Sequence, residues 1–179
     1  MPPPIAVVLA PHSPDWAIRA ASEAARLKGA LGETLVAVHH IGSTAIPGIV
    51  AKPVIDLIPE VTRLADLDSA KDRVVALGYE WWGEYGMPGR RYCSLAEAHT
   101  GQRIVQLHCF ASGSPHIARH LAFRDYLRRR PDVAEAYAAE KRRARDLHPG
   151  DSHAYSEAKS AWIRTTEAAA LAEWRGLPS

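Results

Sequence analysis

The sequence predicts a mixed α/β protein, in which a β-sheet forms the first part of the chain and helices form the rest. Short β-rich runs alternate with helical stretches in the first part, whereas residues 112–179 read as helix almost throughout. With 179 residues, the chain is expected to form one domain, 1–179, with a sheet core at 1–111 and a helical part at 112–179.

Apolar runs and turn residues set the expected elements of the first 80 residues. Pro59 is expected to end a strand, because proline cannot donate a hydrogen bond to a neighbouring strand, and Gly78 is expected to end a helix. The expected elements are a strand at 5–9, a helix at 15–30, strands at 35–41 and 53–58, and a helix at 64–77.

Glycine-containing turns separate three further strands, and three helices follow. Pro131 stands where a helix-opening proline belongs, and Asp151 is a good N-cap after Pro149-Gly150. In the last helix an apolar stripe that includes Tyr155 and Trp162 must be buried, which predicts a helical bundle. These strands are expected at 79–82, 91–95 and 103–110, and the helices at 116–129, 132–147 and 151–174.

Composition excludes several classes of function. The net charge is only +2, and no long basic arm, zinc finger or aromatic RNA-binding block is present, so neither nucleic acid nor a membrane is an expected partner. The apolar run at 5–9 is too short to span a bilayer and does not resemble a secretory leader. Cys93 and Cys109 form no CxxC pair, so we expect two free, buried thiols in a cytoplasmic protein.

The first candidate site is the turn Gly42-Ser43-Thr44 after the strand at 35–41. Glycine lets the backbone turn sharply and approach a ligand, and two hydroxyls beside backbone N–H groups suit phosphate oxygens. A plain turn between a strand and a loop is the alternative. Asp56 follows in the middle of the apolar run 54–58, where an ionised carboxylate is costly unless it is paired or binds a metal. The alternative for Asp56 is a structural ion pair, for example with Lys52.

This pattern resembles the signature of the nucleotidyltransferase superfold, and more narrowly the chain is similar to the GrpB family. The resemblance implies a mixed sheet of the nucleotidyltransferase-like type, with Asp56 as the catalytic or metal-binding carboxylate. Some relatives occur fused to dephospho-coenzyme A kinase, which implies a nucleotide or coenzyme A context. The residues that carry the resemblance are 40–48, 52–56, 89–92, Leu107-His108, 123–127 and the spaced Tyr155, Lys159 and Ile163.

The expected metal chemistry departs from that of active nucleotidyltransferases. Those enzymes hold two magnesium ions between paired carboxylates, but here Ile58 stands at the position of the second acid. Glu60 lies about 13 Å further along the strand, too far to share an ion easily. His40, Asp56 and His108 would suit one ion, with Zn²⁺, Mn²⁺ or iron fitting better than Mg²⁺, and His39 is expected to face the other way. Simple hydrogen bonding of the histidines is the alternative.

Cationic residues complete the predicted ligand site. Lys52, Arg91 and Arg124 are expected to neutralise phosphate groups, although Arg124 could instead pair with an acid of the last helices. Trp81-Trp82 and residues 87–89 could supply a wall for a base or a pantetheine arm, or simply pack the strands.

Three hypotheses follow for the function. The first is an enzyme, a metal-dependent nucleotidyl or phosphoryl transferase that binds a nucleotide or another phosphate-containing ligand at Gly42-Ser43-Thr44 and Asp56. The second is a non-catalytic ligand-binding or regulatory module linked to coenzyme A or nucleotide metabolism, which the isoleucine at position 58 favours. The third is a metal-dependent hydrolase that uses His40, Asp56 and His108.

Overall fold

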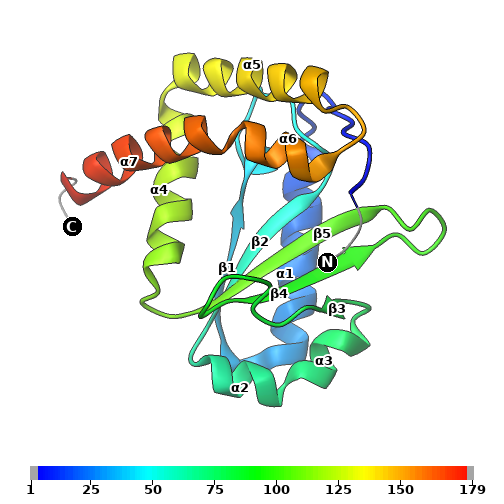
Figure 1. The fold of residues 1–179 in the computed structure, drawn as a ribbon. Coiled ribbons are helices and arrows are strands. Elements are labelled where there is room, and N and C mark those ends of the chain that lie inside the picture. The colour runs from blue at the N-terminus through cyan, green and yellow to red at the C-terminus, as the bar shows by residue number, and fades with distance from the viewer. Residues whose placement is uncertain (1–3, 177–179) are drawn as a thin grey trace. The chain divides into compact units, whose positions relative to one another are not determined.

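The computed structural model describes residues 4–176, and the chain divides into two compact units (Figure 1). The sheet unit consists of residues 14–42 and 54–117. The helical unit consists of residues 4–13, 43–53 and 118–176. The chain therefore leaves the sheet unit after Gly42 and returns to it at Val54, so that an eleven-residue segment just after the first strand belongs to the helical unit.

The sheet unit contains a five-stranded mixed sheet with the strand order β1-β2-β5-β4-β3. β2 and β5 run parallel, and the other neighbouring strands run antiparallel. The prediction of a mixed α/β fold is confirmed, and the two strands that flank the Gly42 turn, β1 and β2, pair with each other. The strands are β1 (Leu35–Ile41), β2 (Ile55–Val61), β3 (Glu80–Trp81), β4 (Arg91–Ala96) and β5 (Arg103–Ala111).

Helices α1 (Asp15–Leu31), α2 (Leu64–Ser69) and α3 (Lys71–Ala76) belong to the same unit, and α1 runs along one face of the sheet (Figure 1). On this helix-covered face Leu57 and Leu107, paired on neighbouring strands, are at most 1% exposed. Cys93, which opposes Leu107, is equally buried, and Tyr79 donates a hydrogen bond to Glu23 of α1 at 2.7 Å. Burial of these side chains fixes which face of the sheet is core.

Strand β2 continues through Pro59, contrary to the sequence prediction. On one side, Pro59 pairs with Val38 of β1. On the other side, residues 55–57 and 60–61 of β2 pair with β5, but Ile58 and Pro59 do not. A proline is thus accommodated where the parallel ladder is interrupted, because it has no N–H to donate. The helix expected at 64–77 is likewise divided, at Ala70, into α2 and α3.

Helices α4 to α7 form the bundle that the sequence predicts. Its core includes Phe123, Leu127 and Tyr137, together with Ile46 and Ile49 from the segment 43–53. Asp151 caps α6 by accepting hydrogen bonds from the backbone N–H groups of residues 153 and 154, as expected. The last helix is divided at Lys159. The bounds are α4 (Pro115–Arg129), α5 (Pro131–Leu147), α6 (Ser152–Ala158) and α7 (Ser160–Gly176).

The first expected strand, at 5–9, is wrong. Ile5 exchanges hydrogen bonds with Ser152, and Val7 donates to the carbonyl of Pro149, so this extended segment runs against the helical unit. Val7 packs with Ala144 and Tyr155, which accounts for the apolar sequence of the segment without a place in the sheet. Across residues 4–176, no helix has the length and apolar character that crossing a membrane requires.

Candidate functional site

The strand register shows which side chains share a face with Asp56. Asp56 is directly opposite Ile41 of β1 and Gln106 of β5, and directly opposed residues project to the same side of a sheet. His108, two residues after Gln106, lies on this side too. We call it the polar face, because it carries Asp56, Gln106, His108, Tyr92 and Ser94.

The expected orientation of the two adjacent histidines is reversed. His40 pairs with Leu57, so its side chain lies on the helix-covered face, away from Asp56. His39 lies on the polar face, and its Nε2 is 2.8 Å from Oε2 of Glu60. The alternation along β1 was predicted correctly, but its phase was not. His40 is therefore removed from the candidate metal ligands.

Asp56 and His108 do come together. Oδ1 of Asp56 is 3.5 Å from Nε2 of His108, and the two side chains are 29% and 18% exposed. Consider two ligand atoms that each lie about 2.1 Å from one ion. If the ligand–ion–ligand angle lies between the octahedral and the tetrahedral value, the two atoms are about 3.0–3.4 Å apart. The pair is thus spaced to share a single cation with only a small adjustment, while two or more coordination positions remain for a ligand or water.

Among the residues that the structure describes, a second cation has no comparable set of ligands. Ile58 is fully buried at the position of the second acid, and Glu60 accepts hydrogen bonds from His39 and Ser112, which lower its pKa. Within residues 4–176 no group of three or more His, Cys, Asp and Glu side chains is arranged to hold a metal. The residues present fit one ion completed by an exogenous ligand, and they do not fit a two-metal centre.

Gly42 is in direct contact with the Asp56 carboxylate. Its φ is +70°, a conformation that residues with a Cβ rarely adopt, and a Cβ at this position would lie 2.7 Å from Oδ2 of Asp56. The sequence predicted that Gly42 lets the backbone turn sharply and approach a ligand. What approaches the backbone here is the carboxylate of the next strand.

The other residues of the predicted phosphate turn belong to the helical unit. Ser43 opens a short 3₁₀ turn and accepts a hydrogen bond from the N–H of Ile46, and Thr44 is only 3% exposed. Lys52 places its ammonium group 5.4 Å from the ring centroid of Tyr155, and Lys159 places its own 4.0 Å from the same centroid. Lys52 thus contributes to a cation–π arrangement around a buried tyrosine.

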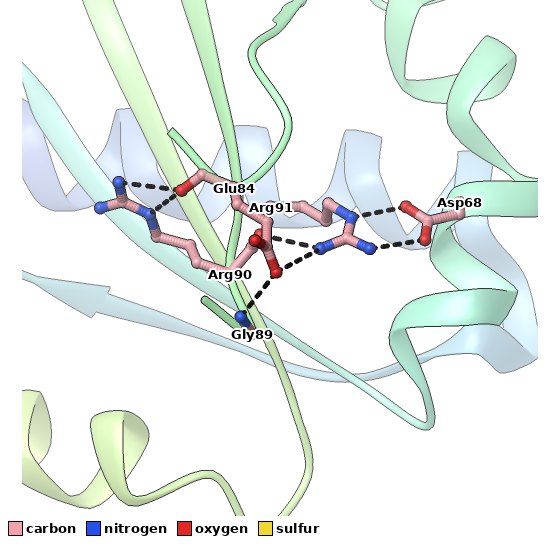
Figure 2. Close-up of polar contacts among 5 residues, drawn as sticks. All are labelled: Asp68, Glu84, Gly89, Arg90 and Arg91. Atoms are coloured by element: carbon pink, nitrogen blue, oxygen red, sulfur yellow. Dashed lines mark hydrogen bonds and ion pairs between the residues drawn. The ribbon is translucent and has the colours of Figure 1, made fainter. Parts of the chain in front are cut away.

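Arg91 is committed to the opposite side of the sheet. Its guanidinium binds both carboxylate oxygens of Asp68, at 2.6 and 2.7 Å, and these bonds raise the pKa of Arg91 and lower that of Asp68. Figure 2 shows the side chains of Arg90 and Arg91 extending in opposite directions. Arg91 therefore does not belong with Asp56, and Arg124 of the helical unit pairs with its neighbour Asp125 at 2.7 Å.

Of the aromatic row that runs across the polar face, sequence reasoning singled out only Trp82 as a possible wall for a base. The rings of Trp82, Tyr85, Tyr92 and His108 follow one another at centroid distances of 6.1, 4.8 and 5.4 Å. Burial raises the pKa of Tyr92 to about 12, so its phenol stays neutral. The signal available in the sequence was alternation: Tyr92 follows Arg91 and must face the other way.

Comparison with known proteins assigns the chain to a family. A model described as GrpB protein matches residues 6–169, which include Gly42, Asp56 and His108. The chain belongs to the GrpB family. The crystal structure of conserved protein GrpB from Enterococcus faecalis is similar, with a TM-score of 0.87 and 34% identity over 93% of this chain and 99% of that one.

Curated GrpB relatives differ in how much of their length this chain covers. UPF0157 protein YqkA of Bacillus subtilis is 38% identical over 87% of this chain, but the match spans 45% of YqkA. Glutamate-rich protein GrpB of Alkalihalophilus pseudofirmus is 28% identical, and 91% of it is matched. The chain is also 32% identical to a protein named dephospho-CoA kinase from Mycolicibacterium paratuberculosis, over 44% of that protein.

Proposed function

We propose that this chain binds a nucleotide or another phosphate-containing ligand on the polar face, through one divalent cation held by Asp56 and His108. The observation that carries the proposal is the spacing of these two side chains, 3.5 Å between Oδ1 and Nε2, on an incompletely buried part of the sheet. A divalent cation bound there would neutralise phosphate oxygens, which would supply the remaining ligands.

Two further observations support a phosphate-containing ligand. The missing Cβ of Gly42 leaves room for the Asp56 carboxylate just after β1, since a Cβ at this position would lie 2.7 Å from Oδ2. The likeness to a protein named dephospho-CoA kinase also supports a nucleotide-related ligand, although this chain matches only part of that protein.

Ile58 favours binding without two-metal phosphoryl transfer. A fully buried isoleucine occupies the position where a transferase would place its second metal-binding carboxylate, and Glu60 is engaged by His39 and Ser112. A binding or regulatory module is therefore the function that the side chains support best. A transferase or a hydrolase would instead reveal itself by turnover of the bound ligand.

Thermal unfolding with ligand and cation together tests this proposal. Tripolyphosphate, nucleoside triphosphates, coenzyme A and dephospho-coenzyme A would each be added with Mg²⁺, Mn²⁺ or Zn²⁺, and again with EDTA. At a hundred times its Kd a ligand stabilises the native state by about 2.7 kcal/mol, so we expect the midpoint to rise by about 5–10 °C. The rise should require both the cation and the phosphate compound, and no shift with any combination would reject the proposal.

A further inference from the structure

We infer that the loop between β3 and β4, residues 82–90, supplies a stacking surface for the heteroaromatic base of a nucleotide, with Tyr85 as its contact residue. The inference rests on the proposed function, because it assigns the other end of the same ligand. It would make the site selective for nucleotides over inorganic polyphosphates.

The loop is a fixed structure. Oε1 of Glu84 accepts a hydrogen bond from the N–H of Gly89 at 2.9 Å, and the Glu84 carbonyl accepts from the N–H of Met87 at 3.1 Å. The guanidinium of Arg90 reaches back to the carbonyls of Glu84 and Tyr85, the latter at 2.7 Å. Figure 2 shows Glu84 at the centre of this arrangement. Side chains on the loop are therefore held in place before any ligand arrives.

Tyr85 adopts an unfavourable backbone conformation. Its φ is +48°, and among residues 4–176 it is the one residue other than glycine with a positive φ. Such a conformation costs free energy in a residue with a Cβ and persists only where the surrounding structure imposes it. Glycine would fit this position without strain, so what tyrosine adds is its ring.

The ring of Tyr85 lies nearly parallel to that of Tyr92, with centroids 4.8 Å apart and an angle of 18° between the planes. Arg90 lies 5.9 Å from the Tyr85 centroid and 5.3 Å from the Tyr92 centroid. Because these distances are similar, Arg90 must lie beside the stack and not over the outer face of Tyr85. The ring of Trp82 is tilted by 59° to that of Tyr85, with the two centroids 6.1 Å apart. Tyr85 itself is only half-buried.

The distance from this surface to the cation-binding pair suits one nucleotide. The Tyr92 ring is 5.4 Å from the ring of His108, which in turn contacts Asp56. These residues lie on β4, β5 and β2, which are adjacent in the sheet, so Asp56 is two strand spacings, about 10 Å, from the strand under Tyr85. A ribose and its phosphate chain bridge a separation of this order.

Calorimetric titration in the presence of Mn²⁺ separates the contributions of base and phosphate. The four ribonucleoside triphosphates and inorganic tripolyphosphate would be titrated into wild type, Tyr85→Gly and Tyr85→Phe. Stacking on an aromatic side chain typically contributes a factor of about ten or more per base. In wild type, at least one triphosphate should therefore bind about tenfold more tightly than tripolyphosphate, and Tyr85→Phe should keep this ratio.

In Tyr85→Gly the ratio of nucleotide affinity to tripolyphosphate affinity should fall to about one, while the affinity for tripolyphosphate is unchanged. The reason is that glycine accepts the backbone conformation, so the substitution removes only the ring. Tyr126→Ala, which removes a tyrosine stacked with Arg130 in the helical unit, should leave both affinities unchanged. If wild type bound tripolyphosphate and all four nucleotides with equal affinity, the stacking inference would be overturned while the proposed function would stand. The same conclusion would follow if Tyr85→Gly lost affinity for nucleotides and for tripolyphosphate to the same extent. Absence of Mn²⁺-dependent binding of any compound would overturn the proposed function as well.

Discussion

Replacing Asp56 by asparagine should weaken Mn²⁺-dependent binding of tripolyphosphate by about a hundredfold or more. Asparagine preserves the shape of the side chain and removes the charge that the cation needs. Loss of a residue that merely orients a metal ligand already costs about 10–100-fold in metal affinity, so loss of a direct ligand should cost at least as much. Isothermal titration calorimetry on wild type and Asp56→Asn measures the difference, and circular dichroism checks that the fold is retained.

Asp68→Asn is the matched control for this experiment. The same chemical change is made in the same unit, but Asp68 binds Arg91, which projects from β4 to the side opposite Tyr92. The affinity for Mn²⁺ and tripolyphosphate should therefore stay within about twofold of wild type. If both variants lost binding equally, the effect would come from net charge or stability and not from coordination by Asp56.

The second large effect is expected on stability. Gly42→Ala should lower the free energy of unfolding by about 3 kcal/mol, because alanine at φ +70° costs about 1–2 kcal/mol and its Cβ overlaps the Asp56 carboxylate. Urea-induced unfolding measures this loss.

Gly113→Ala separates the two contributions to that loss. Gly113 has a φ of +82°, and no atom lies within 4 Å of the place that an alanine methyl group would take, so alanine there should cost only the backbone term, about 1–2 kcal/mol. Removing the carboxylate should relieve the clash at Gly42. In an Asp56→Ala background only the Cβ of residue 56 stays near the new methyl group, at 3.2 Å, so Gly42→Ala should cost clearly less than in wild type and approach the cost of Gly113→Ala. A full loss of about 3 kcal/mol in that background would show that the contact with Oδ2 is unimportant.

Much of the fold was predictable because local patterns and tertiary packing agree. Strand β1 begins and ends where its apolar run predicts, and the sharp turn at Gly42 follows from the need for a positive φ. The segment at 5–9 shows the limit of this reasoning. An apolar, β-branched run is equally suited to packing extended along helices, and only its hydrogen-bond partners distinguish the two outcomes.

The candidate site was predictable in part, because Asp56 and His108 stand out as polar residues in apolar strands. The phase of each strand was not, since a shift of one residue moves every side chain to the other face. That is why the sequence prediction put His40, and not His39, on the same face as Asp56, and why it grouped Arg91 with Asp56. The role of Tyr85 depends on a loop conformation that no periodicity encodes.

The most direct test of the central claim is the location of the cation. Crystals grown with Mn²⁺ and tripolyphosphate, with diffraction data collected at the manganese absorption edge, should show one anomalous peak within bonding distance of both Asp56 Oδ1 and His108 Nε2. The peak should be absent from crystals of Asp56→Asn. Two manganese peaks at Asp56, or a single peak that contacts neither side chain, would contradict the account.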